Sequence, residues 1–151
     1  MARKALKYCL LTYVALTFGV ILWQELPVEE PATEVHWEGG DYSLVTYFHS
    51  KKRCSTCNNM ENYSKEALES NFPSELASKK LRFRVLNWQA EANAAYAKRY
   101  DLLGNAVILS RIEDGKEVDF ENLDEVWTHV HDKGAFIDYV SKEVRDWIGE
   151  S

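Results

Sequence analysis

Residues 44–59 read LVTYFHSKKRCSTCNN, and this stretch decides the fold that the chain is expected to adopt. Its first part, residues 44–49, is a short apolar run rich in β-branched and aromatic side chains, which predicts a strand buried on both faces. A basic loop follows, and then Cys54 and Cys57 open a helix. The two cysteines therefore stand at the carboxyl end of a strand, where chemistry gathers in open α/β sheets.

The composition is that of a single folded domain of ordinary size. The chain has 151 residues, of which 46% are hydrophobic and 28% are charged. Its formal net charge of -6 argues against a nucleic-acid partner, which would need clustered Lys and Arg side chains facing the phosphates. Lys51, Lys52 and Arg53 form a run of positive charge beside the cysteines.

Cysteine usage points to reactive thiols. The chain has Cys9, Cys54 and Cys57, and a structural disulfide framework would need more cysteines spread along the sequence. Cys54 and Cys57 are therefore predicted to form a redox pair or a metal-binding pair.

The N-terminal residues 1–24 are predicted to be a membrane anchor. A basic start with Arg3, Lys4 and Lys7 precedes the uncharged run 8–23, which at about 1.5 Å per residue spans roughly 24 Å. Residues 6–23 would cross the cytoplasmic membrane once, with the basic end inside and the rest of the chain outside the cytoplasm. A cleaved signal peptide is the alternative, although no Ala-x-Ala site is visible.

Residues 25–41 are predicted to be an acidic linker. They contain Pro27, Pro31, several glutamates and a Gly-Gly pair, without a sustained apolar period. Trp37, within this segment, is expected to be a loosely packed loop aromatic.

The remaining periodicities predict an α/β fold. Apolar positions recur at helical spacing after Cys57, and Trp127 belongs to one of two helical stripes near the end. The Asp-Gly pair at 114–115 is typical of a hairpin turn, so the last strand should run antiparallel to its neighbour. We expect a mixed sheet of four strands with helices on both faces. The expected strands are 44–48, 81–86, 106–112 and 117–120, and the expected helices are 57–72, 91–100, 123–130 and 136–148.

A CxxC at a strand-to-helix junction, in this order of elements, resembles the thioredoxin fold, a three-layer α/β arrangement, over roughly residues 44–148. More narrowly, YFHSKKRCSTC (47–57), EALESNF (66–72), AVILSRIEDGKEV (106–118) and DKGAFIDYVSKEVRDW (132–147) resemble the ArsF family of membrane-anchored thioredoxin-like proteins. The resemblance implies that residues 42–151 form the domain, and that the loop with Asn105 and Ala106 faces the substrate. No flavin-binding feature is present, so no cofactor is expected.

Two positions depart from the thioredoxin pattern. Thioredoxins carry a cis-proline before the third strand, whereas Gly104, Asn105 and Ala106 stand here, and a trans peptide is expected because a cis bond before a non-proline residue costs ~3 kcal/mol. Thioredoxins also bury an acid in the first strand, whereas none of the candidate positions here, Thr46, Tyr47 and Phe48, is acidic.

The position of the pair predicts thiol-disulfide exchange. The reactive species is the thiolate, so the pKa of a reactive cysteine must be lowered from about 8.5. Cys54 would face the free N–H groups and the positive end of the helix dipole, with Lys51, Lys52 and Arg53 adding positive charge. Cys54 is therefore assigned as the attacking residue and Cys57 as the resolving one, acting on protein or small-molecule thiols and disulfides.

Two alternatives remain open. The two cysteines, with His49, could hold a thiophilic ion such as arsenite, Cu or Zn, although zinc normally needs four ligands, and no metal site is predicted on that count. The domain could also be a non-catalytic module that binds a protein partner.

Overall fold

The computed structural model describes residue 35 and residues 37–149. The predicted anchor at residues 6–23 and most of the predicted linker at 25–41 lie outside the described residues. No helix within the described ranges is long and apolar enough to cross a membrane.

The described residues form the α/β arrangement expected from the sequence, with each predicted strand and helix present. The strand that leads to the cysteines starts two residues earlier than expected, and the helix at 91–100 begins with a 3₁₀ turn, η1. Pro73 ends one helix and starts a short second one, because its ring fixes a backbone angle suited to the first helical turn. The elements in chain order are β1 (Tyr42–His49), α2 (Ser55–Asn71), α3 (Pro73–Ala77), β2 (Leu81–Asn87), η1 (Glu91–Asn93), α4 (Ala94–Arg99), β3 (Ala106–Glu113), β4 (Lys116–Asn122), α5 (Val126–His129) and α6 (Lys133–Gly149).

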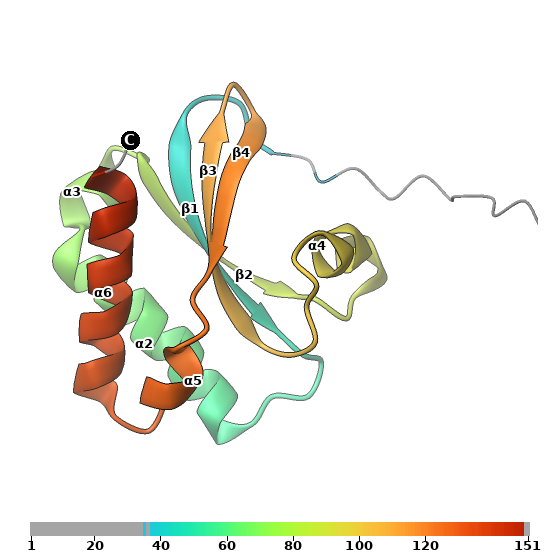
Figure 1. Cartoon of the computed structure of the whole chain (residues 1–151), viewed down its shortest axis with the longest axis vertical. Coiled ribbons are helices and arrows are strands. Elements are labelled where there is room, and N and C mark those ends of the chain that lie inside the picture. The colour runs from blue at the N-terminus through green and yellow to red at the C-terminus, as the bar shows by residue number, and fades with distance from the viewer. Residues whose placement is uncertain (1–34, 36, 150–151) are drawn as a thin grey trace, which may run out of the picture. The chain divides into compact units, whose positions relative to one another are not determined.

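The strands form one mixed sheet in the order β2-β1-β3-β4 (Figure 1). β1 pairs in parallel with β2 and antiparallel with β3, and β3 pairs antiparallel with β4. The β3–β4 turn places Asp114 at φ 49° and Gly115 at φ 71°, the left-handed region that a tight hairpin of this hand requires. The expected antiparallel last strand is therefore confirmed.

Helices cover both faces of the sheet (Figure 1). Val45 and Tyr47 of β1 belong to one apolar core, which they share with residues of α2 and α6. Leu44 and Phe48, the alternate residues, belong to a second core together with Tyr96 of α4. Because β1 is an inner strand covered on both faces, its sequence is a nearly continuous apolar run and does not alternate between apolar and polar residues.

Two tryptophans lie where the sequence did not predict them. Trp37 is only 9% exposed; its ring packs edge-on against Tyr96, with centroids 5.7 Å apart, and lies beneath the Arg84 guanidinium. The apolar core thus begins within the predicted linker. Trp127 is 49% exposed on the short helix α5, whereas Val126 and the C-cap residue Val130 are buried.

Candidate functional site

The loop after β1 delivers Cys54 to the start of α2. Cys54 is the N-cap residue, with an extended backbone (φ -111°, ψ 170°), and its sulfur accepts a hydrogen bond from the Cys57 backbone N–H at 3.2 Å. An N-cap side chain normally satisfies one of the free N–H groups of the first turn, and here a sulfur atom takes that role. The helix therefore presents its positive end to the sulfur of Cys54.

Cys54 and Cys57 form a disulfide, with their Cα atoms 5.0 Å apart. The two sulfurs differ in access, because Cys54 is exposed whereas Cys57 is only 6% exposed and packs in the first turn of α2. A CxxC pair at disulfide distance in an α/β domain is compatible with a redox function. An external thiol can reach Cys54 more readily than Cys57.

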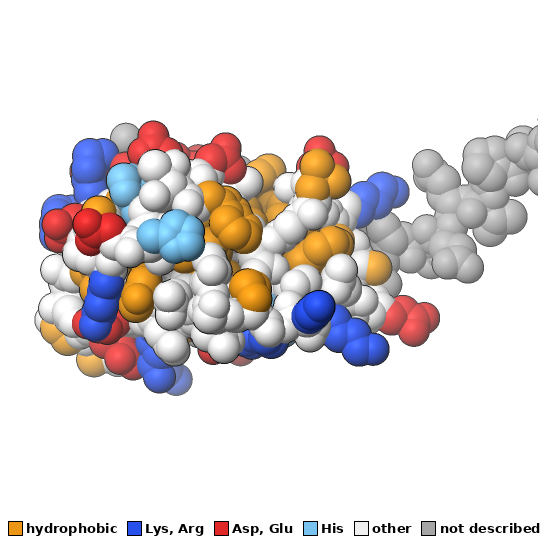
Figure 2. Space-filling view, turned by 90° about the horizontal axis from the view of Figure 1, so that it is seen from below, with side chains coloured by type: hydrophobic (Ala, Val, Ile, Leu, Met, Phe, Trp, Pro, Cys, Tyr) orange, Lys and Arg blue, Asp and Glu red, His pale blue; other side chains and the backbone are white. Residues whose placement is uncertain are grey.

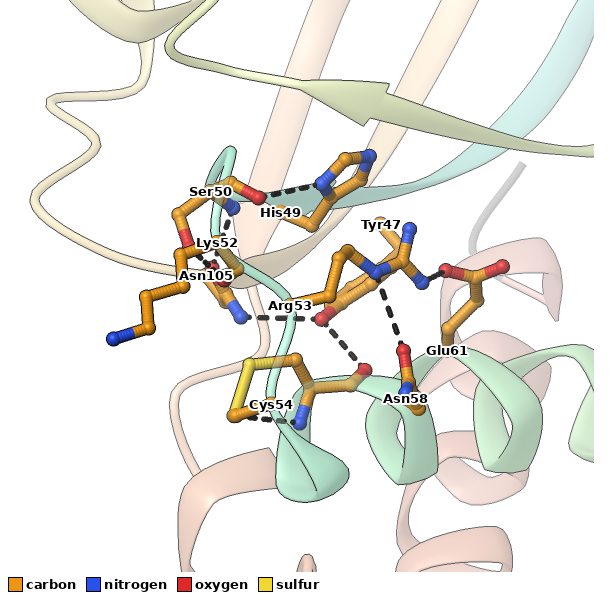
Figure 3. Close-up of a disulfide and its surroundings, with 10 residues drawn as sticks. Tyr47, His49, Ser50, Lys52, Arg53, Cys54, Asn58, Glu61 and Asn105 are labelled. Atoms are coloured by element: carbon orange, nitrogen blue, oxygen red, sulfur yellow. Dashed lines mark hydrogen bonds and ion pairs between the residues drawn. A yellow bond between two sulfur atoms is a disulfide. The ribbon is translucent and has the colours of Figure 1, made fainter.

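A buried hydrogen-bond network lies behind the disulfide (Figure 3). The Tyr47 hydroxyl donates to the Cys57 carbonyl oxygen at 2.8 Å and accepts from Nδ2 of Asn105 at 3.2 Å. Oδ1 of Asn105 accepts from the Ser50 backbone N–H at 2.8 Å. One side chain on the loop before β3 thus ties together the end of β1, the basic loop and the first turn of α2.

Trp127 extends this network to the surface. Its indole Nε1 donates to the Asn105 backbone oxygen at 3.1 Å, so Asn105 is held from both sides. Asn105 itself is 7% exposed, and its side chain points into the network (Figure 3). Ala106, the first residue of β3, is also buried and pairs with Phe48. The side chains of both residues are therefore engaged inside the domain, and their predicted role in facing a substrate stays a prediction.

Tyr47 remains a neutral hydrogen-bond donor over the whole physiological range. Burial raises the pKa of its hydroxyl from 10.0 to about 12, the Glu61 carboxylate acts in the same direction, and Arg53 and the hydrogen bond from Asn105 partly oppose them. β1 thus contributes a neutral hydroxyl beneath the second cysteine. Thr46, also buried, turns the other way and accepts from Nε of Arg84 at 3.0 Å.

The three basic residues of the loop have different surroundings. The Arg53 guanidinium forms an ion pair with Glu61 and donates from Nε to Asn58 Oδ1 at 3.3 Å, so its charge is largely offset. Lys51 and Lys52 are exposed, and neither ammonium forms an ion pair with any described residue. The side chains of Lys52 and Arg53 leave the loop on opposite sides (Figure 3). Stabilisation of the Cys54 thiolate by all three residues stays a prediction. Arg53 would contribute least to it, because its charge is offset by Glu61.

The peptide bonds of the stretch before β3 are trans, as expected without a proline. Among residues 35 and 37–149, no group of three or more His, Cys, Asp and Glu side chains is placed to hold a metal ion. The ring of His49 is engaged locally, with Nδ1 lying 2.8 Å from the Ser50 carbonyl oxygen.

Sequence reasoning missed two residues of this site. The sequence marks Tyr47 only as a position without an acid, because nothing in an apolar strand shows which hydroxyl will find hydrogen-bond partners. Trp127 fits the apolar stripe at 123, 126 and 130, so its spacing predicts burial. In the structure, Val126 and Val130 are buried but Trp127 is half exposed.

A scan against models of known protein families found no match, and no curated protein matches the chain either. Among solved structures, the chain is similar to one described as "Structure of a malarial protein", with 13% sequence identity and a TM-score of 0.36. That match covers 54% of this chain and 80% of the other. A likeness this weak carries no argument about fold or activity.

Proposed function

We propose that the chain is a thiol-disulfide oxidoreductase that uses Cys54 and Cys57. The observation that carries the proposal is the unequal access of the two sulfurs, with Cys54 exposed at the N-cap of α2 and Cys57 buried behind it. A structural disulfide would gain nothing from presenting one sulfur to solvent at the positive end of a helix, whereas an exchanging one needs that arrangement.

The exchange proceeds in two balanced steps. A thiolate of the partner attacks the Cys54 sulfur, the Cys54–Cys57 bond breaks, and Cys57 leaves as a thiolate. The second thiolate of the partner then attacks the partner sulfur that is bonded to Cys54. The partner leaves as a disulfide, and Cys54 is released as a thiolate at the helix N-terminus. In sum, two electrons and two protons pass from the partner dithiol to the cysteine pair. The reverse reaction uses the same bonds, with Cys54 as the attacking residue.

The proposal includes a thioredoxin-like three-layer fold and kinship with the ArsF family. The support is the mixed four-stranded sheet between helical layers, with the CxxC at the end of β1. The chain departs from thioredoxin at the positions of the cis-proline and the buried acid, where Asn105 and Tyr47 form their own network.

The proposal also places the domain outside the cytoplasm, tethered through residues 6–23, with protein or small-molecule thiols and disulfides as partners. Its support is the sequence alone: the basic start, the apolar run and the acidic segment after it. Alkaline carbonate extraction of the full chain tests this part, because a single-pass protein stays in the pellet. Release into the supernatant, or a mature N-terminus near residue 24, would contradict it.

The decisive test of the chemistry is a redox titration of the full-length protein in detergent against glutathione buffers, read by alkylation of free thiols. We expect a single two-electron transition with a potential between about -270 and -120 mV. A Cys57→Ser variant should trap a mixed disulfide at Cys54, whereas Cys54→Ser should trap none. A pair that does not exchange with glutathione in either direction would refute the proposal.

A further inference from the structure

The surface around the disulfide combines an apolar part with a basic part. Leu103 is 89% exposed in the loop before β3, and Trp127 presents about half of its surface to solvent. Trp127 Nε1 reaches the backbone of Asn105, and the side chain of Asn105 reaches Ser50 at the start of the basic loop. The indole and the basic loop, which leads into the exposed Cys54, therefore lie on two sides of one residue.

Figure 2 views this end of the domain and shows hydrophobic side chains exposed near its middle, with side chains of both charges around its rim. Exposed apolar side chains that adjoin a reactive group are typical of a binding surface, because a partner that covers them removes their area from water.

Lys51 and Lys52 supply the basic part of this surface. Lys51 and Lys52 form no ion pair with any residue that the structure describes, whereas Arg53 is offset by Glu61. The chain as a whole carries a net charge of -6, so two unpaired lysines beside Cys54 reverse the prevailing sign locally. On the other side, Asp124 and Glu125 are exposed next to Trp127 in sequence. Carboxylates of a partner are therefore favoured at the lysines and disfavoured at the indole.

We propose that this face selects partner polypeptides whose reactive cysteine is flanked by acidic and apolar side chains, with the carboxylates at Lys51 and Lys52 and an apolar side chain on Trp127. The inference rests on the proposed exchange activity and specifies its substrate class. Attraction between unlike charges speeds the encounter with Cys54, and apolar contact on the indole prolongs it.

Three synthetic dithiol peptides test the charge selection. They share two cysteines and one leucine and differ only in having Glu, Gln or Lys at the flanking positions. Each is mixed with the oxidised full-length protein at low ionic strength, and the rate of Cys54–Cys57 reduction is divided by the rate of the same peptide with the neutral 2-hydroxyethyl disulfide. That division removes the effect of flanking charge on the peptide thiols themselves.

The normalised rate of the Glu peptide should be about tenfold higher than that of the Lys peptide, and the ratio of these two rates should fall toward one at high salt. The double variant Lys51→Glu/Lys52→Glu should reverse the order. The matched control is Lys79→Glu/Lys80→Glu, an adjacent and exposed lysine pair just before β2, at the opposite end of the sheet. It changes the net charge equally and should leave the order intact.

Trp127→Gln tests the apolar contact, with peptides that carry Leu or Ser beside the cysteine. The wild type should favour the Leu peptide several-fold, and the variant should lose that preference while keeping the charge preference. Equal ratios for all peptides, or equal effects of the two lysine variants, would overturn the inference and leave the exchange activity standing. Failure of the oxidised protein to react even with dithiothreitol would instead overturn the proposed function together with the inference.

Discussion

Tyr47→Phe removes one oxygen atom from the centre of the network behind the disulfide. The ring is fully buried, and its hydroxyl makes two hydrogen bonds, to the Cys57 carbonyl and from the Asn105 amide. Phenylalanine keeps the apolar packing, so the change isolates the polar contribution. The Cys57 carbonyl keeps its place in the hydrogen-bond ladder of α2, but the buried Asn105 Nδ2 loses its acceptor.

The expected loss of stability follows from these two bonds. A buried donor left without an acceptor costs about 1–3 kcal/mol, and this range also covers the net loss of an ordinary hydrogen bond. The free energy of unfolding should therefore fall by about 1–3 kcal/mol, equivalent to a shift in Tm of roughly 4 °C per kcal/mol for a domain of this size. Urea denaturation of the oxidised protein measures it, with an unchanged m-value showing that the unfolded state is unaffected.

Tyr63→Phe is the matched control, because Tyr63 also lies on the α2 side of the sheet and packs against Phe136, but its hydroxyl has no hydrogen bond to any described residue. It should change stability by less than about 0.5 kcal/mol. A double-mutant cycle of Tyr47→Phe with Asn105→Ala should give a coupling energy of at least about 0.5 kcal/mol. Equal effects of Tyr47→Phe and Tyr63→Phe, or strict additivity with Asn105→Ala, would refute the role given to the network.

Three further outcomes are expected. Burial raises the pKa of Tyr47 to about 12 against 10.0 for an ordinary tyrosine, so the unfolded state releases this proton at a lower pH than the folded state does. Between pH 10 and 12 this group should therefore lower the free energy of unfolding by about 1.4 kcal/mol per pH unit. In urea titrations over that range, the free energy of unfolding of Tyr47→Phe should fall less steeply than that of the wild type. Phe136→Ala removes a fully buried ring from the core and should reduce stability by about 3–5 kcal/mol in the same assay, whereas a loss below 1 kcal/mol would contradict its core position. Glu61→Gln removes the ion-pair partner of the Arg53 guanidinium, which lies next to Cys54 in sequence. Alkylation of the reduced Cys54 thiol at mildly acidic pH should therefore become about twofold faster at low salt. An unchanged rate, or an increase that persists in high salt, would count against an electrostatic effect.

The sequence by itself determined the elements and the reactive pair. The strand before the cysteines, the helix after them and the hairpin at Asp114 each follow from local spacing, since side-chain period and turn chemistry act over a few residues. The chemical character of Cys54 is equally local, because it depends on the N-cap position and on its neighbours in the chain.

Only the tertiary structure decided the strand order, the antiparallel run of β3 beside β1, and what surrounds the pair. Period-two alternation sets which face of a strand is buried, but it does not choose the neighbouring strand. The contacts of Asn105 with Ser50 and Tyr47 join residues 55 and 58 positions apart, and no local pattern encodes them. The same holds for Trp127, which lies on an apolar stripe yet stays exposed, because its burial depends on how far α5 extends and on what packs over it.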